Sequence, residues 1–243
     1  MIANAINANL FNFLPQNASA KYIDAKGASL ATGDTDLYTV PAGKKALFFG
    51  HSSFNASAGN ISYYFQIKVS SVYYRITSVV TLATGVRTTL SGTTVIVLNA
   101  GESLSINTAT TNGLNVLTRV VEFDATLNGI KTSRVLALST GDNTIYTVPA
   151  GKTAILLGGL DMISSAQILV MNDSGGNRTY NAYVVPSGGA AGTSNKVEAA
   201  NTVADNVFTT FTCFTTLNTG DFIVVNTDDG AATQTAWVNY AEI

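Results

Sequence analysis

The amino-acid sequence predicts an all-β protein with two tandem β-sandwich domains, jelly-roll-like, formed by internal duplication and preceded by a short N-terminal arm. Two observations predict it. A long segment of the sequence occurs twice, and each copy contains a series of short β-branched and aromatic runs separated by turn residues. With 243 residues, of which 46% are hydrophobic, the chain is long enough for two domains that each bury a core.

The repeat is clear at two places. Residues 30–46 recur as residues 138–154, so that Pro41 matches Pro149 at an offset of 108, and residues 98–107 match residues 217–226 at an offset of 119. The second copy therefore holds eleven extra residues between these anchors. We expect them in the Gly-, Ala- and Ser-rich segment Ser187–Ser194. The resulting division is an arm (1–27), a first domain (28–124), a linker (125–137) and a second domain (138–243).

Each copy contains seven or eight runs with the character of strands. Leu37–Val40 ends at the Pro41–Gly43 turn, because proline cannot donate to a β-ladder. Residues 61–69 alternate, with Tyr63 and Phe65 on one face. The other runs are 45–49, 72–82, 93–98, 104–106 and 116–123, followed in the second copy by 153–157, 166–171, 179–185, 207–217, 222–225 and 236–243. Jelly-roll and immunoglobulin-like sandwiches both fit this pattern. Eight strands and the absence of a Cys–Trp–Cys pattern favour the jelly roll.

Composition excludes several classes of function. Charged residues make up 12% of the chain, against about 25% in an average domain, and such a surface desolvates readily in an assembly. The net charge is −2 and the basic residues are scattered, so we expect no nucleic-acid partner. No apolar run is long enough for a membrane span, Met1–Asn4 lacks the basic start of a signal peptide, and the single Cys213 excludes an internal disulfide.

We find no catalytic set, cofactor site or metal site in the sequence. His51 is the only histidine, so every triad must use it, and the offset of 108 places Gly159 at its position in the second copy. We interpret His51 as a polar residue at a strand end and Cys213 as a buried, inert thiol. Ala150–Thr153 resembles the tail of a phosphate-binding loop but lacks the earlier glycine, and the expected structure is a turn. The sequence therefore predicts no enzyme.

Acidic and aromatic residues leave binding roles open. Potential calcium ligands are the carboxylates of Asp34, Asp36 and the pair Asp228–Asp229. Turn formation is the more common role of such residues. The pairs Tyr63–Tyr64 and Tyr73–Tyr74 and the single Trp237 are candidates for sugar stacking or for a protein interface. Adjacent residues of a strand point to opposite faces, so one tyrosine of each pair is expected outside.

The segment 37–46 and its twin 145–154 resemble a strand–turn–strand signature that is frequent in virion proteins of tailed bacteriophages. The Asn-rich turns 55–60 and 172–177 follow it. This resemblance implies a non-enzymatic structural protein of the virion, assembled in the host cytoplasm. It favours a capsid decoration or cement protein, a homotrimer that contacts the major capsid protein. The alternative is a tail, baseplate or fibre module that adheres to the host surface, with glycan as a possible ligand.

Residues 1–27 have no counterpart before the second copy. Five large apolar residues in this arm recur at three- and four-residue steps, as on one face of a helix: Ile2, Ile6, Leu10, Phe13 and Leu14. The four asparagines among them lower helix propensity, so an extended arm is an alternative. We expect these five residues to be assembly contacts with a neighbouring subunit or the capsid shell; packing on their own sandwich is the other possibility.

Overall fold

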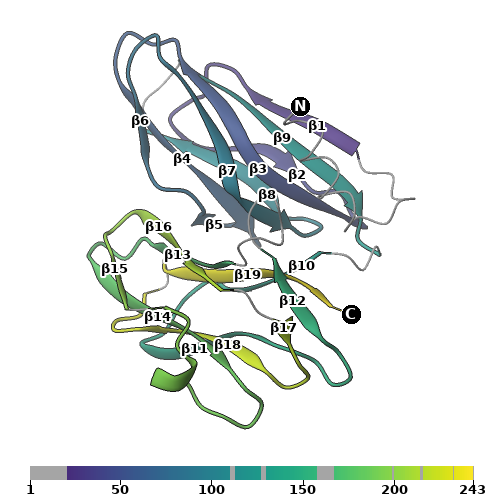
Figure 1. Cartoon of the computed structure of the whole chain (residues 1–243). Coiled ribbons are helices and arrows are strands. Elements are labelled where there is room, and N and C mark those ends of the chain that lie inside the picture. The colour runs from purple at the N-terminus through teal and green to yellow at the C-terminus, as the bar shows by residue number, and fades with distance from the viewer. Residues whose placement is uncertain are drawn as a thin grey trace, which may run out of the picture. The chain divides into compact units, whose positions relative to one another are not determined.

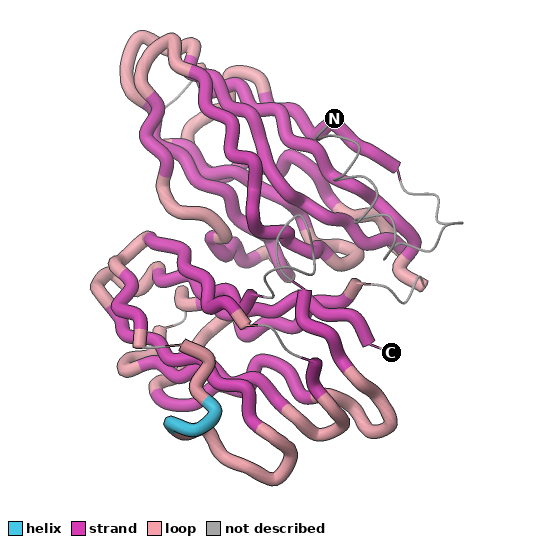
Figure 2. Tube along the Cα trace, in the orientation of Figure 1, coloured by secondary structure: helices cyan, strands magenta, loops and turns pink. Residues whose placement is uncertain are grey.

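The protein is all-β, in a computed structural model that describes residues 21–109, 113–126, 130–157, 167–198, 200–213, 216–231 and 233–242. Its described residues fall into two compact units, which divide between Leu127 and Asn128. In the tube view of Figure 2, both consist of strands and loops, with one 3-10 turn, η1 (Thr193–Asn195), as the helical element of the described chain. No described helix has the length and apolar character to span a membrane.

The N-terminal unit is a jelly roll of two antiparallel sheets. One sheet has the order β1-β9-β3-β7 and the other β2-β8-β4-β5, with β6 also paired to β4. Taken in chain order with β5 and β6 as one strand, this interleaving of eight strands is the jelly-roll topology. Figure 1 shows the strands, which are β1 (Lys21–Gly27), β2 (Gly33–Thr39), β3 (Lys44–Asn55), β4 (Ile61–Val69), β5 (Val72–Arg75), β6 (Val80–Leu82), β7 (Arg87–Leu98), β8 (Ser103–Thr108) and β9 (Leu114–Asp124).

The C-terminal unit has the same strand order. In the first sheet, β19 lies between β10 on one side and β12 and β13 on the other. β12 pairs in turn with β17, and β13 pairs with β16. The second sheet has the order β11-β18-β14-β15. β12 and β13 therefore correspond to the two halves of β3. The strands are β10 (Lys131–Val135), β11 (Gly141–Thr147), β12 (Ala154–Leu157), β13 (Gln167–Asn172), β14 (Arg178–Val185), β15 (Asn201–Val203), β16 (Val207–Thr212), β17 (Thr216–Leu217), β18 (Phe222–Thr227) and β19 (Thr235–Glu242).

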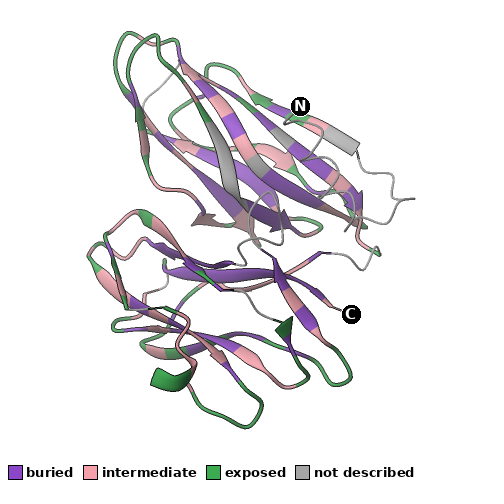
Figure 3. Ribbon diagram, viewed as in Figure 1, coloured by how far each residue is buried: buried purple, intermediate pink, exposed green. Residues whose placement is uncertain are grey.

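Alternating apolar residues of both sheets form each core. In the C-terminal roll, Ile168 and Val170 of one sheet pack with Tyr180 and Ala182 of the other in one buried cluster. In the N-terminal roll, Phe48 of β3 stacks on Phe65 of β4 with ring centroids 5.3 Å apart. Figure 3 shows this burial along the strands.

The repeated Val-Pro-Ala-Gly segment forms the same turn twice. The Lys44 amide donates to the Pro41 carbonyl at 3.1 Å, and the Lys152 amide donates to Pro149 at 3.2 Å. The third turn residues, Gly43 and Gly151, have φ of 74° and 71°, which is the left-handed region that a type II turn requires there. The predicted turn is therefore confirmed.

The structure corrects three expectations about the ends of the rolls and the extra residues. β1 pairs with β9 along its whole length, so residues 21–27 belong to the first jelly roll rather than to an arm. β10 pairs with β19 in the same way, so residues 131–135 are a strand of the second roll, not linker. β1 therefore has a counterpart in the second copy.

The third correction concerns the eleven extra residues. Ala46 pairs with Glu122 as Ala154 pairs with Glu242, so the two copies are offset by 108 residues at this point. At Asn55 and Asn172 the offset has grown to 117. Nine residues are thus added between β12 and the end of β13. The β14–β15 connection, which contains Ser187–Ser194, accounts for a smaller part.

Candidate functional site

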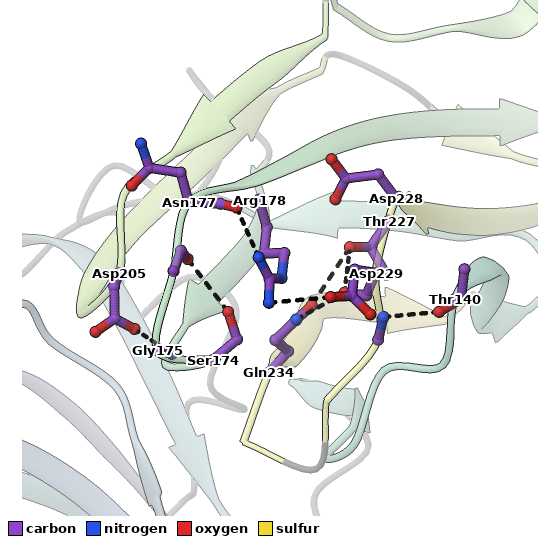
Figure 4. Close-up of polar contacts among 12 residues, drawn as sticks. Thr140, Ser174, Gly175, Asn177, Arg178, Asp205, Thr227, Asp228, Asp229 and Gln234 are labelled. Carbon is purple, nitrogen blue, oxygen red and sulfur yellow. Dashed lines mark hydrogen bonds and ion pairs between the residues drawn. The ribbon is translucent and has the colours of Figure 1, made fainter.

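A cluster of polar loops closes one end of the C-terminal jelly roll (Figure 4). Its centre is Arg178 of β14, which forms an ion pair with Asp229 of the β18–β19 loop (Nη2 to Oδ2, 3.0 Å) and donates to the Asn177 carbonyl at 2.9 Å. Asp228 accepts the Thr179 amide, and Asp205 accepts the Gly175 amide. Three loops from different parts of the chain are thus joined by carboxylates.

Two buried amide side chains hold the loops of this end in place. Asn172, which is fully buried, donates from Nδ2 to the carbonyls of Gly176 and Val203, both at 2.8 Å. Gln234 is also fully buried; it accepts from the Tyr180 hydroxyl at 3.0 Å and donates to the Asp229 carbonyl at 2.8 Å. Burying such amides without partners is costly, so these bonds fix the loop conformations.

These contacts support turn formation rather than calcium binding by the acidic residues. Asp228 and Asp229 are engaged by an amide and a guanidinium. Among the described residues, no group of three or more His, Cys, Asp or Glu side chains is arranged to hold a metal ion.

A second polar region, which we call the polar strip, covers the outer face of the sheet β2-β8-β4-β5. Asp34 accepts from Gln66 and Asn107, both at 2.6 Å. Asp36 accepts from Ser105 at 2.6 Å and forms an ion pair with Lys68 at 2.8 Å. Asn107 and Ser105 lie on β8, next to β2, whereas Gln66 and Lys68 lie on β4, one strand further across. The strip therefore crosses the sheet.

Aromatic rings continue the polar strip at the edge of the sheet. The Tyr73 hydroxyl donates to Asp36 at 3.3 Å, and the Lys68 ammonium lies 5.1 Å from the Tyr73 ring centre. The Arg75 guanidinium lies 3.8 Å from the Tyr64 ring centre. Burial alone would raise the pKa of Asp36, but hydrogen bonds from Lys68 and Ser105 outweigh it and the pKa is lowered. The Asp36 carboxylate is therefore anionic at neutral pH.

A hollow of about 340 Å³ lies on the outer face of the other N-terminal sheet, lined among others by Lys26, Phe54, Arg87 and Leu117. Leu117 is 43% exposed. Lys26 and Arg87 form no ion pair with another residue that the structure describes. The hollow thus combines two cations with apolar side chains. The sequence gives no local signal for it, because its residues come from β1, β3, β7 and β9.

His51 does not lie at a strand end, as the sequence suggested, but within β3 and buried in the core. Its Nε2 atom is 3.2 Å from the Tyr63 hydroxyl, and its ring centre is 4.4 Å from that of Phe65. Burial lowers the pKa of His51 to about 4. By strand register its counterpart is Ile168, not Gly159, because His51 pairs with Thr118 as Ile168 pairs with Val238.

The other candidate residues occupy structural positions. Cys213 is buried in the C-terminal core, and burial raises the pKa of its thiol to about 12. Lys152 lies in the turn after Pro149. Tyr63 points into the core and Tyr64 points outward, as predicted. Trp237 is 3% exposed and does not offer an open stacking surface. The predicted assembly contacts Ile2, Ile6, Leu10, Phe13 and Leu14 lie outside the described residues.

No known protein family matches this sequence, and no curated protein matches it. Among solved structures, the chain is similar to the STIV MCP, with 10% identity, a TM-score of 0.34 and coverage of 94% of both chains. A pentameric capsid protein from metagenomic phage sequences shows 17% identity and a TM-score of 0.26, over 44% of this chain and 64% of that one. A fucolectin from striped bass (Morone saxatilis) serum shows 11% identity and a TM-score of 0.24, over 92% and 96%.

Proposed function

We propose that this chain is a non-enzymatic structural protein of a bacteriophage virion, and that it decorates the capsid as a cement protein. The observation that carries the proposal is the concentration of exposed apolar side chains on the N-terminal jelly roll. Of the five large hydrophobic residues that are exposed in the described chain, four lie there: Val72, Val79, Val86 and Leu117. Leu117 is one of the residues that line the hollow, together with Phe54, and apolar side chains exposed together at a hollow are typical of an interaction surface.

Three features of the chain support the proposal. The strand–turn–strand signature that resembles phage virion proteins forms the same structural element in both jelly rolls. The low content of charged residues reduces the desolvation needed on assembly. The hollow beside Leu117 adds two cations, so the partner surface on the shell is expected to be apolar with acidic neighbours. We further propose a homotrimer as the unit that binds the shell.

The copy number of the protein in purified virions tests this proposal. Hundreds of copies per particle, measured by quantitative mass spectrometry, are expected of a decoration protein, whereas a handful of copies would place it in the tail. A surface test uses Leu117→Asp, which introduces a charge beside the hollow, and Val207→Asp, which introduces the same charge on the C-terminal roll at a residue that is 36% exposed. With both variants folded, we expect only Leu117→Asp to lose binding to undecorated particles.

A second candidate function is adhesion to a host-surface glycan by a tail, baseplate or fibre module. The polar strip favours it, because carboxylate, amide and tyrosine side chains, the groups that form hydrogen bonds to sugars, lie together on the outer face of one sheet. Glycan-array binding that is lost in Asp34→Ala and retained in Asp142→Ala would support adhesion. Asp142 is a matched control, since it accepts from Asn226 as Asp34 accepts from Asn107.

A further inference from the structure

The outer face of the C-terminal sheet that contains β19 is almost completely buried along β13 and β19, and most of its large side chains are apolar. Residues that alternate with the core cluster point to this face, among them Leu157, Leu169, Met171 and Trp237, with exposed fractions of 1%, 1%, 0% and 3%. Phe208 adds its ring 5.7 Å from that of Trp237. In a sandwich only the inner face of each sheet packs on the other sheet, so such an outer face requires a further partner.

The same face of the N-terminal jelly roll has a different character. At the positions equivalent to Leu169 and Trp237 it carries Ser52 and Leu117, and Leu117 is 43% exposed. An apolar outer face is therefore not a requirement of the fold. It is a specific property of the C-terminal roll.

Two polar groups on the buried face indicate the chemistry of the partner. The Trp237 Nε1 atom and the Thr235 Oγ1 atom are buried and have no hydrogen-bond partner within the described chain. Leaving such donors unpaired is unfavourable. A suitable partner brings large apolar side chains and a few amide oxygens that accept hydrogen bonds.

We propose that the segment Met1–Leu14 of the same polypeptide is this partner and docks as a helix on the face around Trp237. The segment contains no charged side chain, and its five large apolar residues share one helical face. Two of its asparagines, Asn7 and Asn9, border this face of the helix and supply acceptors for the unpaired donors. As a helix it is about 21 Å long, close to the roughly 26 Å that the eight residues of β19 span.

Trp237 reports directly on this docking, because it is the only tryptophan of the chain. In purified protein that lacks Met1–Pro15, we expect tryptophan emission to shift to longer wavelength and acrylamide quenching to rise severalfold. A synthetic Met1–Pro15 peptide added in excess should reverse both changes. Unchanged emission and quenching in a folded deletion variant would overturn the proposal.

A pair of full-length variants covers the case in which the deletion does not fold. Ile6→Asp with Leu10→Asp charges the apolar face of the arm, whereas Asn4→Asp with Asn12→Asp adds the same charge on the opposite side of the helix. Only the first pair should expose Trp237 to quencher; equal effects of the two pairs would contradict docking through that face. These measurements need no virion, so their outcome is independent of the proposed function.

Discussion

Asn55 and Asn172 make the same hydrogen bonds at the same point of the two jelly rolls. Each is fully buried and donates from Nδ2 to the carbonyl four residues later and to a carbonyl that ends a distant strand, Leu82 or Val203, all at 2.8 Å. Each also accepts from the hydroxyl and the amide of a serine two residues later. One side chain therefore holds two loops together in both units.

Replacing this asparagine should be strongly destabilising. Asn172→Ala removes the side-chain donor to the buried Val203 carbonyl and the bonds to Gly176 and Ser174. We therefore expect a loss of about 2–4 kcal/mol in the free energy of unfolding. Asn55→Ala should act alike in the N-terminal roll. Chemical denaturation measures the effect. The exposed Asn177→Ala is the control and should stay within about 0.5 kcal/mol; an equal loss there would show that the buried network is not the cause.

The Val-Pro-Ala-Gly turns should tolerate only glycine at their last position. Gly43→Val places a β-branched residue at φ 74°, and beyond the neighbouring residues no atom lies within 4 Å of the new Cβ, so we attribute the loss to strain in the backbone. We expect about 1 kcal/mol or more, and the same for Gly151→Val. Thermal melting checks this, with Ala42→Ser as the matched control in the same turn. A neutral Gly43→Val would mean that the turn is not of type II.

A tyrosine–glutamate contact joins the two sheets of each roll and should contribute to stability. The Tyr38 hydroxyl donates to Glu122 at 2.6 Å and the Tyr146 hydroxyl to Glu242 at 3.0 Å. Because both glutamates are only partly buried, we expect Tyr38→Phe and Tyr146→Phe to cost about 1 kcal/mol each. Denaturation curves measure this against Tyr64→Phe, whose hydroxyl has no such partner among the residues that the structure describes. Losses no larger than that of Tyr64→Phe would refute the contribution.

Patterns within a few residues were enough to predict much of this fold. The identical spacing of Pro41 and Pro149 predicted the shared turn, and the alternation of residues 61–69 predicted which tyrosine faces the core. The net offset between two anchors gave the number of extra residues, but it contained no information on where between the anchors they lie. A Gly- and Ser-rich composition then indicated the wrong loop for most of them.

Other features depend on contacts between distant segments. β1 and β10 are short and rich in polar residues, and their pairing with β9 and β19 is what makes them strands. In the second half of β3 the usual pattern is inverted: His51, Ser53 and Asn55 point inward, while Phe54 points toward the hollow. Alternation of hydrophobic residues fails there, and for this reason the burial of His51 was not foreseen.

The burial of His51 should make the N-terminal jelly roll sensitive to acid. An unperturbed histidine titrates near pH 6.5, whereas burial lowers the pKa of His51 to about 4. Between these values the unfolded chain binds a proton that the folded chain does not. As far as His51 is concerned, the free energy of unfolding is therefore at its maximum above pH 6.5, falls as the pH drops toward 4, and changes no further below pH 4. The largest loss is about 3 kcal/mol.

The variant His51→Ile isolates this effect, because Ile168 occupies the equivalent position in the other roll. We expect hydrogen exchange of β3 to accelerate between pH 6.5 and 4 in the wild type, after correction for intrinsic exchange rates, and to remain nearly constant in His51→Ile. Exchange of β13 in the same samples serves as the internal control. A variant whose β3 loses protection in acid as steeply as the wild type would show that another group is responsible.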